Sequence, residues 1–529
     1  MQTGKQARLP QRLFATLMLA GLAGLAGLTA GLLAGCGLPP RGEPPETATL
    51  PVEATAATPL AQSIARETAT HPDLTGIDPL ADPLASFAAR VDLIRAAQRT
   101  LDVQYYIWRN DLTGKLLLDE VRDAAERGVR VRLLLDDNGV PSSLDALLRA
   151  LASHPNIEVR LFNPFAVRWP KQAGFLTDFR RLNRRMHNKS LTADGVASIV
   201  GGRNIGDEYF GATDGVVFAD LDVLAIGPAA RDIALDFDRY WASQSAYPIA
   251  LLVATADNGA LDAALRDLPR DPASSRYVQA LDQVTDVDRL LRGELPLLWA
   301  RTTLVSDDPA KILGQADPAQ HIFAQLHAIL GNPRRELDLV SPYFVPGESG
   351  TEFFEQLAAS GVKVRILTNS LEATDVLPVH SGYARRRAEL VRAGITLYEL
   401  RRAAGQTAQK YYSVGMFGSS GSSLHAKTFS IDTERVFVGS LNFDPRSANL
   451  NTELGFVIDS PELAARIEAA LWNLAPKLAY EVRLDSDDRL YWLRQSSDGP
   501  VRYGTEPNST WYQRAAVYLF SILPIEWLL

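Results

Sequence analysis

The sequence His187-Asn188-Lys189, four intervening residues, Asp194, six intervening residues and Gly201-Gly202-Arg203-Asn204 forms a pattern that occurs twice in this chain. The second copy is His425-Ala426-Lys427, Asp432 and Gly439-Ser440-Leu441-Asn442, with the same internal spacing. The chain has only seven histidines, and two of them stand in this context. A long internal repeat is typical of a duplicated fold, so we expect two similar halves.

The residues that precede each copy follow one order, which predicts a strand, a helix and a second strand. A glycine ends the predicted helix in both halves, Gly128 in the first and Gly361 in the second. Strand and helix alternating at this rhythm predict the α/β class, with a sheet that contains parallel strands in each half. The predicted elements are strands 101–108 and 129–135 around helix 114–127, and strands 337–344 and 362–367 around helix 351–359, with further strands near Ile157 and Ile395.

The repeated residues are those that phosphoryl transfer through histidine requires. Side chains alternate along an extended chain, so His187 and Lys189 share a face, as do His425 and Lys427. If the halves face each other, one neutral histidine can attack phosphorus and the other can move a proton. The two lysines, with Asn204 and Asn442, would stabilise the phosphoryl oxygens, and no metal or cofactor is required. One histidine beside a lysine is more often structural, but two copies with identical spacing argue against that interpretation.

The paired motif resembles the phospholipase D superfamily, whose signature is HxKxxxxD followed by GxxN. The stretches Asn442-Phe443-Asp444-Pro445-Arg446-Ser447 and Val103-Gln104-Tyr105-Tyr106-Ile107-Trp108 are similar to its cardiolipin-synthase-like branch. The resemblance covers about residues 80–480. It implies a duplicated α/β sandwich of two pseudo-symmetric halves, with the active site at their interface.

The resemblance also implies roles for individual residues. His187 would be the nucleophile and His425 the general acid and base. The family orients its histidines through downstream carboxylates, and Glu453 fits that position for His425. Gly215 stands at the equivalent position of the first half, so Asp220 is the better choice for His187, with Asp222 as the runner-up.

Three further motif residues are expected to support the site. Asp194 and Asp432 belong to the signature, but we expect them to hold the local backbone instead of carrying protons. Ser440 keeps a hydroxyl that Gly202 lacks at the matching position, so the two halves are not interchangeable.

The N-terminus predicts export and attachment to a membrane. Lys5, Arg8 and Arg12 precede an apolar stretch, 13–33, that ends in Leu33-Ala34-Gly35-Cys36. This resembles a bacterial lipoprotein signal, in which Cys36 becomes the lipid-bearing first residue. An uncleaved signal anchor is the alternative, since about 20 apolar residues can span a bilayer. Either way the body would lie in the cell envelope, facing the periplasm, and Gly37 slightly favours the outer membrane.

Cys36 is the only cysteine in the chain, which excludes an internal disulfide and a zinc site built from several thiolates.

Composition and pattern divide the chain into six parts. These are a signal peptide (1–35), a flexible tether (36–75), the first half (76–250), a helical insertion (251–320), the second half (321–482) and a C-terminal extension (483–529). The extension contains a short strand near Trp492 and an apolar helix, Trp511–Leu529, interrupted by Pro524. That helix is too short to span a membrane, and either packs on the body or lies in the membrane interface.

The predicted activity is transfer of a phosphatidyl group to make cardiolipin from phosphatidylglycerol, with phosphatidylethanolamine as a possible second substrate. Hydrolysis to phosphatidic acid needs the same residues, so it stays the alternative. Arginines near both motifs would suit lipid headgroups, nucleic-acid phosphates or solvated helix faces, but a net charge of −8 disfavours a nuclease. A non-catalytic lipid-binding protein would be expected to have lost a histidine or lysine, and none is missing. Oligomeric state cannot be inferred from these patterns. The arginines are Arg180, Arg181, Arg184, Arg185, Arg385, Arg386 and Arg387.

Overall fold

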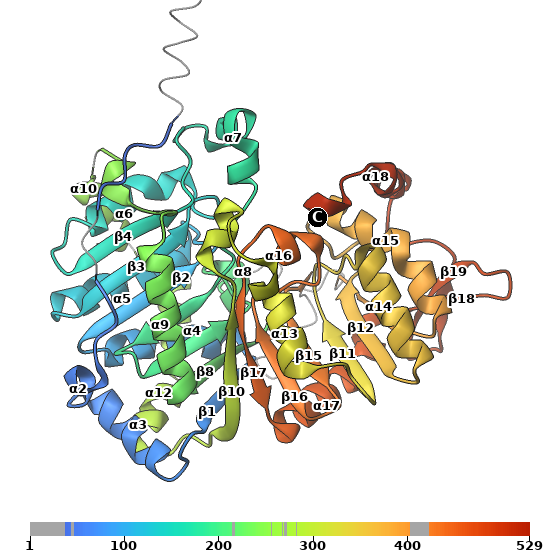
Figure 1. Ribbon diagram of the computed structural model, residues 1–529, viewed down its shortest axis with the longest axis horizontal. Helices are drawn as coiled ribbons and strands as arrows, with labels where there is room; N and C mark the ends of the chain where they lie inside the picture. The colour runs from blue at the N-terminus through green and yellow to red at the C-terminus, as the bar shows by residue number, and fades with distance from the viewer. Residues whose placement is uncertain are drawn as a thin grey trace, which may run out of the picture.

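The computed structural model describes residues 37–529 except 44–46, 214–216, 255, 267, 269–271, 282 and 403–422. It contains two similar halves, each a mixed sheet with helices on both faces, and the halves lie side by side (Figure 1). The duplicated α/β sandwich that the repeat predicted is therefore confirmed.

The sheet of the first half has the strand order β9-β4-β3-β2-β5-β6-β8-β1. The central strands β2, β3 and β4 are parallel, and the other pairings are antiparallel. The strands are β1 (Thr75–Leu80), β2 (Thr100–Tyr105), β3 (Arg130–Asp136), β4 (Ile157–Phe162), β5 (Ser190–Ala193), β6 (Ala197–Gly201), β8 (Asp222–Ile226) and β9 (Ala246–Pro248).

The second half repeats this order as β10-β17-β16-β15-β11-β12-β13-β18-β19-β20. Strand β10 (Leu298–Ser306) belongs to both sheets, because residues 298–300 pair with β1 and residues 301–306 pair with β17. The other strands are β11 (Glu336–Val340), β12 (Lys363–Asn369), β13 (Thr396–Leu400), β15 (Thr428–Ile431), β16 (Arg435–Gly439), β17 (Leu454–Asp459), β18 (Ala479–Leu484), β19 (Leu490–Arg494) and β20 (Val501–Tyr503).

The helices bury apolar stripes against these sheets. Three large clusters form the core, one within each half and one between the halves, which joins α9 and α17 to strands of both sheets. The main helices are α4 (Pro83–Ala96), α5 (Leu112–Glu126), α6 (Asp145–Leu151), α7 (Phe175–Leu182), α8 (Asp207–Phe210), α9 (Pro228–Ala242), α13 (Ile322–Leu330), α14 (Gly347–Ala359), α15 (Leu377–Arg392), α16 (Pro445–Asn449) and α17 (Pro461–Leu478).

The strand–helix–strand predictions of both halves are confirmed, within a few residues at each end. Gly128 and Gly361 follow α5 and α14 with φ of +95° and +89°. Such left-handed backbone at the end of a helix favours glycine, which explains why the same residue stops the helix in both halves.

The two motif aspartates hold the backbone, as expected. Asp194 has a φ of +51°, and its carboxylate accepts hydrogen bonds from the main-chain N–H groups of Gln98, Arg99 and Thr100 at 2.7–3.2 Å. Asp432, with a φ of +56°, does the same for residues 334–336. Each aspartate therefore fixes the start of a central parallel strand, β2 or β11, beside the hairpin that follows a histidine.

The predicted flexible tether was wrong for residues 47–75. This segment contains α2 (Val52–Thr55), α3 (Pro59–Ala69) and the first residue of β1. Thr58 caps α3, and Pro59 occupies its first turn, which favours helix initiation. Leu60 and Ile64, four residues apart, bury one face of α3 in the core of the first half. The signal peptide and Cys36 lie outside the described residues.

The region predicted as a helical insertion is only partly helical. It contains α10 (Asn258–Arg266), α11 (Pro272–Leu281) and α12 (Asp286–Arg292), but β10 follows them and joins the two sheets. The pattern of residues 298–306 was not recognised as a strand, because its edge position leaves Arg301 exposed and its alternation irregular.

The C-terminal helix α18 (Trp511–Ile522) packs on α15 and buries Val517. Its remaining apolar side chains are largely exposed. Among the described residues, every helix is too short or too polar to traverse a bilayer.

We expect Asp194→Ala to lower the free energy of unfolding by about 3 kcal/mol, because three main-chain N–H groups lose a charged acceptor. Asp194→Asn keeps one acceptor oxygen and tolerates a positive φ, so it should cost less. Chemical denaturation followed by circular dichroism measures both, with the half-exposed Asp123→Ala as control. Equal stability of the alanine variant and the control would contradict this role.

Candidate active site

His187 lies in a segment that pairs with the other half of the chain. Its main-chain N–H donates to Thr452 O at 2.9 Å, and the N–H of Thr452 donates to Arg185 O at 3.0 Å. The residue after Thr452 is Glu453, whose Oε2 lies 2.8 Å from His187 Nδ1. Backbone pairing between the halves therefore brings this carboxylate to the histidine.

His425 makes the equivalent contacts with the first half. Strand β14 (Ser423–Leu424) pairs in parallel with β7 (Phe218–Ala219) of the first half, and His425 N–H donates to Ala219 O at 2.8 Å. The residue after Ala219 is Asp220, whose Oδ2 lies 2.6 Å from His425 Nδ1. All four side chains are buried.

The structure corrects the assignment of the two carboxylates. Glu453 was expected to orient His425, and Asp220 to orient His187, but each carboxylate binds the histidine of the opposite half. The physical reason is the exchange of backbone hydrogen bonds between the halves, which sequence spacing within one half cannot reveal.

The carboxylates are held differently, and this explains the unequal glycine and serine in the two motifs. Ser440 Oγ donates to Glu453 Oε2 at 2.5 Å, and Ser447 Oγ donates to Oε1 at 2.8 Å. In the first half, a Cβ on Gly202 would lie only 2.1 Å from Asp220 Oδ1. The shorter aspartate occupies the space that a serine side chain would need, so Gly202 cannot be replaced by serine without displacing Asp220.

Asp222, the runner-up for orienting a histidine, has a structural role instead. Its Oδ2 accepts hydrogen bonds from Ser86 Oγ and from Arg90, both at 2.8 Å, and it also binds Arg203. These groups are buried, and the Asp222 carboxylate is engaged by them and not by a histidine.

The two lysines and two histidines share one electrostatic environment. Burial, with the positive charges of Lys189 and Lys427, lowers the pKa of His187 to about 4, although Glu453 opposes the shift. Burial lowers the pKa of His425 to about 3, together with Lys427 and Lys189. Each histidine thus feels the lysine of the other half. Burial also lowers the pKa of Lys189 to about 7 and that of Lys427 to about 8.

The carboxylates stay ionised beside these cations. Burial alone would raise the pKa of Asp220, but Lys427 and His425 hold it well below its ordinary value. Burial likewise opposes ionisation of Glu453, yet His187, Lys189 and the Ser440 hydroxyl keep its pKa below the usual range. An ionised acceptor at Nδ1 leaves the proton on that nitrogen, so Nε2 carries the lone pair.

The two motif asparagines differ in the hydrogen bonds that their side-chain amides make. Asn204 Oδ1 accepts from Ile107 N–H at 3.1 Å, and its Nδ2 donates to the Tyr209 hydroxyl at 3.1 Å. Asn442 Oδ1 is buried and has no hydrogen-bond partner among the described residues. Of the two amides, that of Asn442 is the freer to bind a ligand.

Aromatic rings enclose the histidines, and no local sequence pattern predicts these contacts. Tyr106 contacts His187 edge to face, with ring centroids 5.0 Å apart. Tyr209 and Phe218 contact His425 at 5.1 and 5.3 Å. Tyr106 belongs to the stretch that resembles the family, but its contact with a histidine 81 positions away required the fold.

Comparison with known families identifies the domain that contains both motifs. The family described as "Cardiolipin synthase, PLD-like domain" matches residues 91–241 and 326–475, once in each half. The chain belongs to this phospholipase-D-like family. Each match contains one histidine–lysine motif and one of the crossed carboxylates.

Several curated proteins are similar over most of the chain. "Cardiolipin synthase C" of Escherichia coli (strain K12) is 47% identical over 474 residues, which cover 89% of this chain and 99% of that protein. An uncharacterised protein of Helicobacter pylori (strain ATCC 700392 / 26695) is 33% identical, covering 88% of this chain and 92% of its own length. Among solved structures, the phosphatidylserine synthase of Haemophilus influenzae Rd KW20 has a TM-score of 0.54 at 14% identity. It covers 88% of this chain and 100% of that one, and supports the fold alone.

The arginine clusters beside the family motifs are divided between buried and exposed side chains. Arg185 and Arg387 are buried, and they bind Asp136 at 2.6 Å and Glu399 at 2.7 Å. Arg180 and Arg385 are exposed, and the other three arginines are partly buried.

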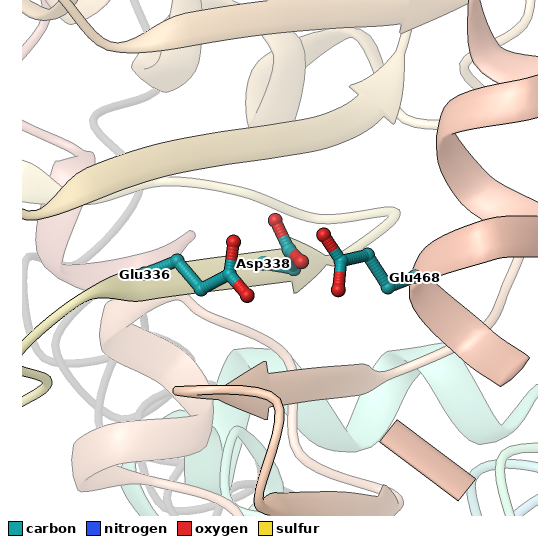
Figure 2. Close-up of side chains that lie close together, drawn as sticks. All are labelled: Glu336, Asp338 and Glu468. Carbon is teal, nitrogen blue, oxygen red and sulfur yellow. The ribbon is translucent and has the colours of Figure 1, made fainter. Parts of the chain in front are cut away.

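An acidic cluster with the composition of a cation site lies away from the histidines. Glu336 and Asp338 of β11 converge with Glu468 of α17 (Figure 2). Arg365 already occupies the centre, 2.5 Å from Asp338, 2.7 Å from Glu468 and 3.2 Å from Glu336. In the first half Arg132 binds Asp102 and Asp238 in the same manner, at 2.6 and 2.7 Å. The cluster is therefore a duplicated structural ion pair between two parallel strands and a helix.

The crossed pairing can be tested by histidine ¹⁵N NMR at neutral pH. Glu453→Gln should shift the Nδ1 and Nε2 resonances of His187, and Asp220→Asn should shift those of His425, because each removes the charge at 2.8 or 2.6 Å. Signals are assigned with His187→Asn and His425→Asn. Shifts confined to the histidine of the carboxylate's own half would contradict the structure.

The lowered pKa values of the histidines predict loss of stability in acid. The folded protein resists protonation of His187 and His425, whereas the unfolded chain takes up protons near the ordinary pKa of 6.5. The free energy of unfolding should therefore fall as pH drops from about 6.5 towards about 4. Thermal melts across this range should show a smaller decline for the His187→Asn/His425→Asn variant. An equal decline would show that other groups govern the acid response.

Proposed function

We propose that this phosphatidyltransferase makes cardiolipin by moving a phosphatidyl group from one phospholipid onto phosphatidylglycerol through a phosphatidyl-histidine intermediate. The main support is the complete duplicated set of histidine, lysine and asparagine, with a carboxylate at each histidine Nδ1. Similarity to "Cardiolipin synthase C" over nearly its whole length favours this substrate class.

In the first half-reaction, His187 is the nucleophile. Glu453 accepts a hydrogen bond from the protonated Nδ1, so the Nε2 lone pair is available to attack phosphorus. The P–Nε2 bond forms as the bond from phosphorus to the leaving alkoxide breaks, and His425 gives its Nε2 proton to that alkoxide. Lys189 and Lys427 bind the phosphoryl oxygens and offset their charge.

In the second half-reaction, His425 accepts the proton of the phosphatidylglycerol hydroxyl. The alkoxide attacks phosphorus, the P–Nε2 bond breaks, and cardiolipin leaves with both histidines in their starting states. If water replaces the alcohol, the product is phosphatidic acid, and the enzyme is a phospholipase D. The residues are the same for both outcomes.

The lowered pKa values describe the site without substrate. An arriving phosphodiester brings one negative charge close to both lysines, which raises the pKa of the nearby His425 towards the range that an acid needs. Substrate binding and protonation of the general acid are therefore coupled.

The proposed location is the periplasmic side of the cell envelope, with lipidated Cys36 as the anchor and the outer membrane slightly favoured. Labelling cells with a fatty acid tests the anchor, because Cys36→Ala should remove the label. Persistent labelling of that variant would place the lipid elsewhere.

Product analysis tests the reaction. The protein is incubated with phosphatidylglycerol vesicles, with and without phosphatidylethanolamine, and the lipids are measured by mass spectrometry. Cardiolipin should accumulate as phosphatidylglycerol falls, and faster formation with phosphatidylethanolamine would identify that lipid as the donor. Phosphatidic acid alone would establish the hydrolase.

We expect His187→Ala and His425→Ala each to lower turnover by about 1,000-fold or more, since each removes a group that bonds or moves a proton in every cycle. With labelled phospholipid, His425→Asn should retain label on the protein, whereas His187→Asn should not. The reverse pattern would exchange the two roles. EDTA should leave turnover unchanged, and strong inhibition reversed by one divalent metal would contradict the metal-free mechanism.

A further inference from the structure

Two segments far apart in the sequence expose large apolar side chains at one edge of the molecule. The first is α7 with the loop before it, where Trp169 is 83% and Leu176 is 90% exposed. The second is α18 with the residues after it, where Trp511 is 74% and Tyr518 is 70% exposed. Both lie at the upper edge in Figure 1. We call these side chains the apolar rim: Trp169, Leu176, Phe179, Trp511, Tyr518, Leu519, Ile522 and Trp527.

The two parts of the rim are joined through Arg446 of α16. Its guanidinium donates to Asn183 O at 2.9 Å, next to α7, and its main-chain N–H donates to Leu529 O at 2.8 Å, after α18. The next residue, Ser447, donates to Glu453, which holds His187. The rim is thus connected to the catalytic histidine through a single short helix.

The chemistry of the rim favours a phospholipid bilayer as its occupant. Tryptophan and tyrosine have apolar rings with a polar edge, and such residues concentrate at the headgroup level of membranes. The sequence from Trp511 to Ile525 contains no acidic residue. Arg180, exposed beside Phe179, can meet lipid phosphates.

We propose that the apolar rim inserts into the membrane interface and holds the entrance of the active site against the bilayer, so that phospholipids reach His187 and His425 without leaving the membrane. This proposal rests on the proposed lipid substrates. Residues 37–43 also lie at this edge (Figure 1), and they directly follow Cys36, so an anchor there would orient the same face towards the membrane.

Tryptophan fluorescence tests insertion without reference to activity. The full chain is mixed with phosphatidylglycerol and phosphatidylethanolamine vesicles whose acyl chains carry bromine, which quenches only tryptophans that enter the bilayer. Replacing Trp169, Trp511 and Trp527 by Phe should remove more than half of the quenching. Trp299→Phe and Trp472→Phe, away from the rim, should leave it unchanged. Quenching that is insensitive to the three rim tryptophans would overturn the proposal.

Substrate presentation provides the second test. Leu176→Glu and Ile522→Glu should each lower turnover on vesicles by about tenfold, because a charge replaces a side chain that enters the bilayer. Turnover on a short-chain phosphatidylglycerol below its micelle concentration should change less than twofold. Leu235→Glu on α9, an exposed leucine away from the rim, is the matched control.

The outcomes separate docking from catalysis. Equal losses on vesicles and on monomeric lipid would show damage to the active site and would overturn the docking role. Loss on vesicles equal to that of Leu235→Glu would overturn it as well. If the unmodified enzyme makes no cardiolipin from either substrate, the proposed function fails, while rim-dependent quenching would still support docking.

Discussion

The exchange of backbone hydrogen bonds between the halves is the constraint on which the site depends. Residues 185–187 pair with Thr452, and residues 423–425 pair with 218–219. The backbone of each histidine is therefore hydrogen-bonded to the opposite half. A buried imidazole whose Nδ1 lacked a carboxylate would have neither a fixed tautomer nor a lone pair held at Nε2. The pairing between the halves provides both features. The same Nδ1–carboxylate contact is therefore formed twice, once at each histidine.

Much of this arrangement could be predicted from the sequence, because the relevant signals are local. The repeated motif predicted the duplication and the four central side chains. The alternation of strand and helix, with Gly128 and Gly361 as stops, predicted the parallel centre of each sheet. The backbone role of Asp194 and Asp432 could also be predicted, since a short carboxylate tolerates a positive φ and accepts from nearby amides.

The errors all concern contacts between distant parts of the chain. Glu453 and Asp220 were recognised as the relevant carboxylates, but each was given to the histidine of the wrong half. A residue's spacing within its own repeat carries no information about pairing across an interface. Likewise, residues 47–75 are rich in small and polar residues, and only the surface provided by the first half makes α3 stable. The two ends of β10 pair with different sheets, which leaves Arg301 exposed and the alternation irregular, so the sequence pattern did not predict this strand.

The crossed pairing also governs when the active site can exist. Glu453 lies 266 positions after His187, and β10 completes both sheets from the middle of the chain. During synthesis the first half can bury its own core, but His187 remains without a carboxylate at Nδ1 until residues near 453 have emerged and folded against it. A nascent or truncated chain therefore has no assembled catalytic centre. Chemistry on phospholipids begins only once both halves have been made and joined.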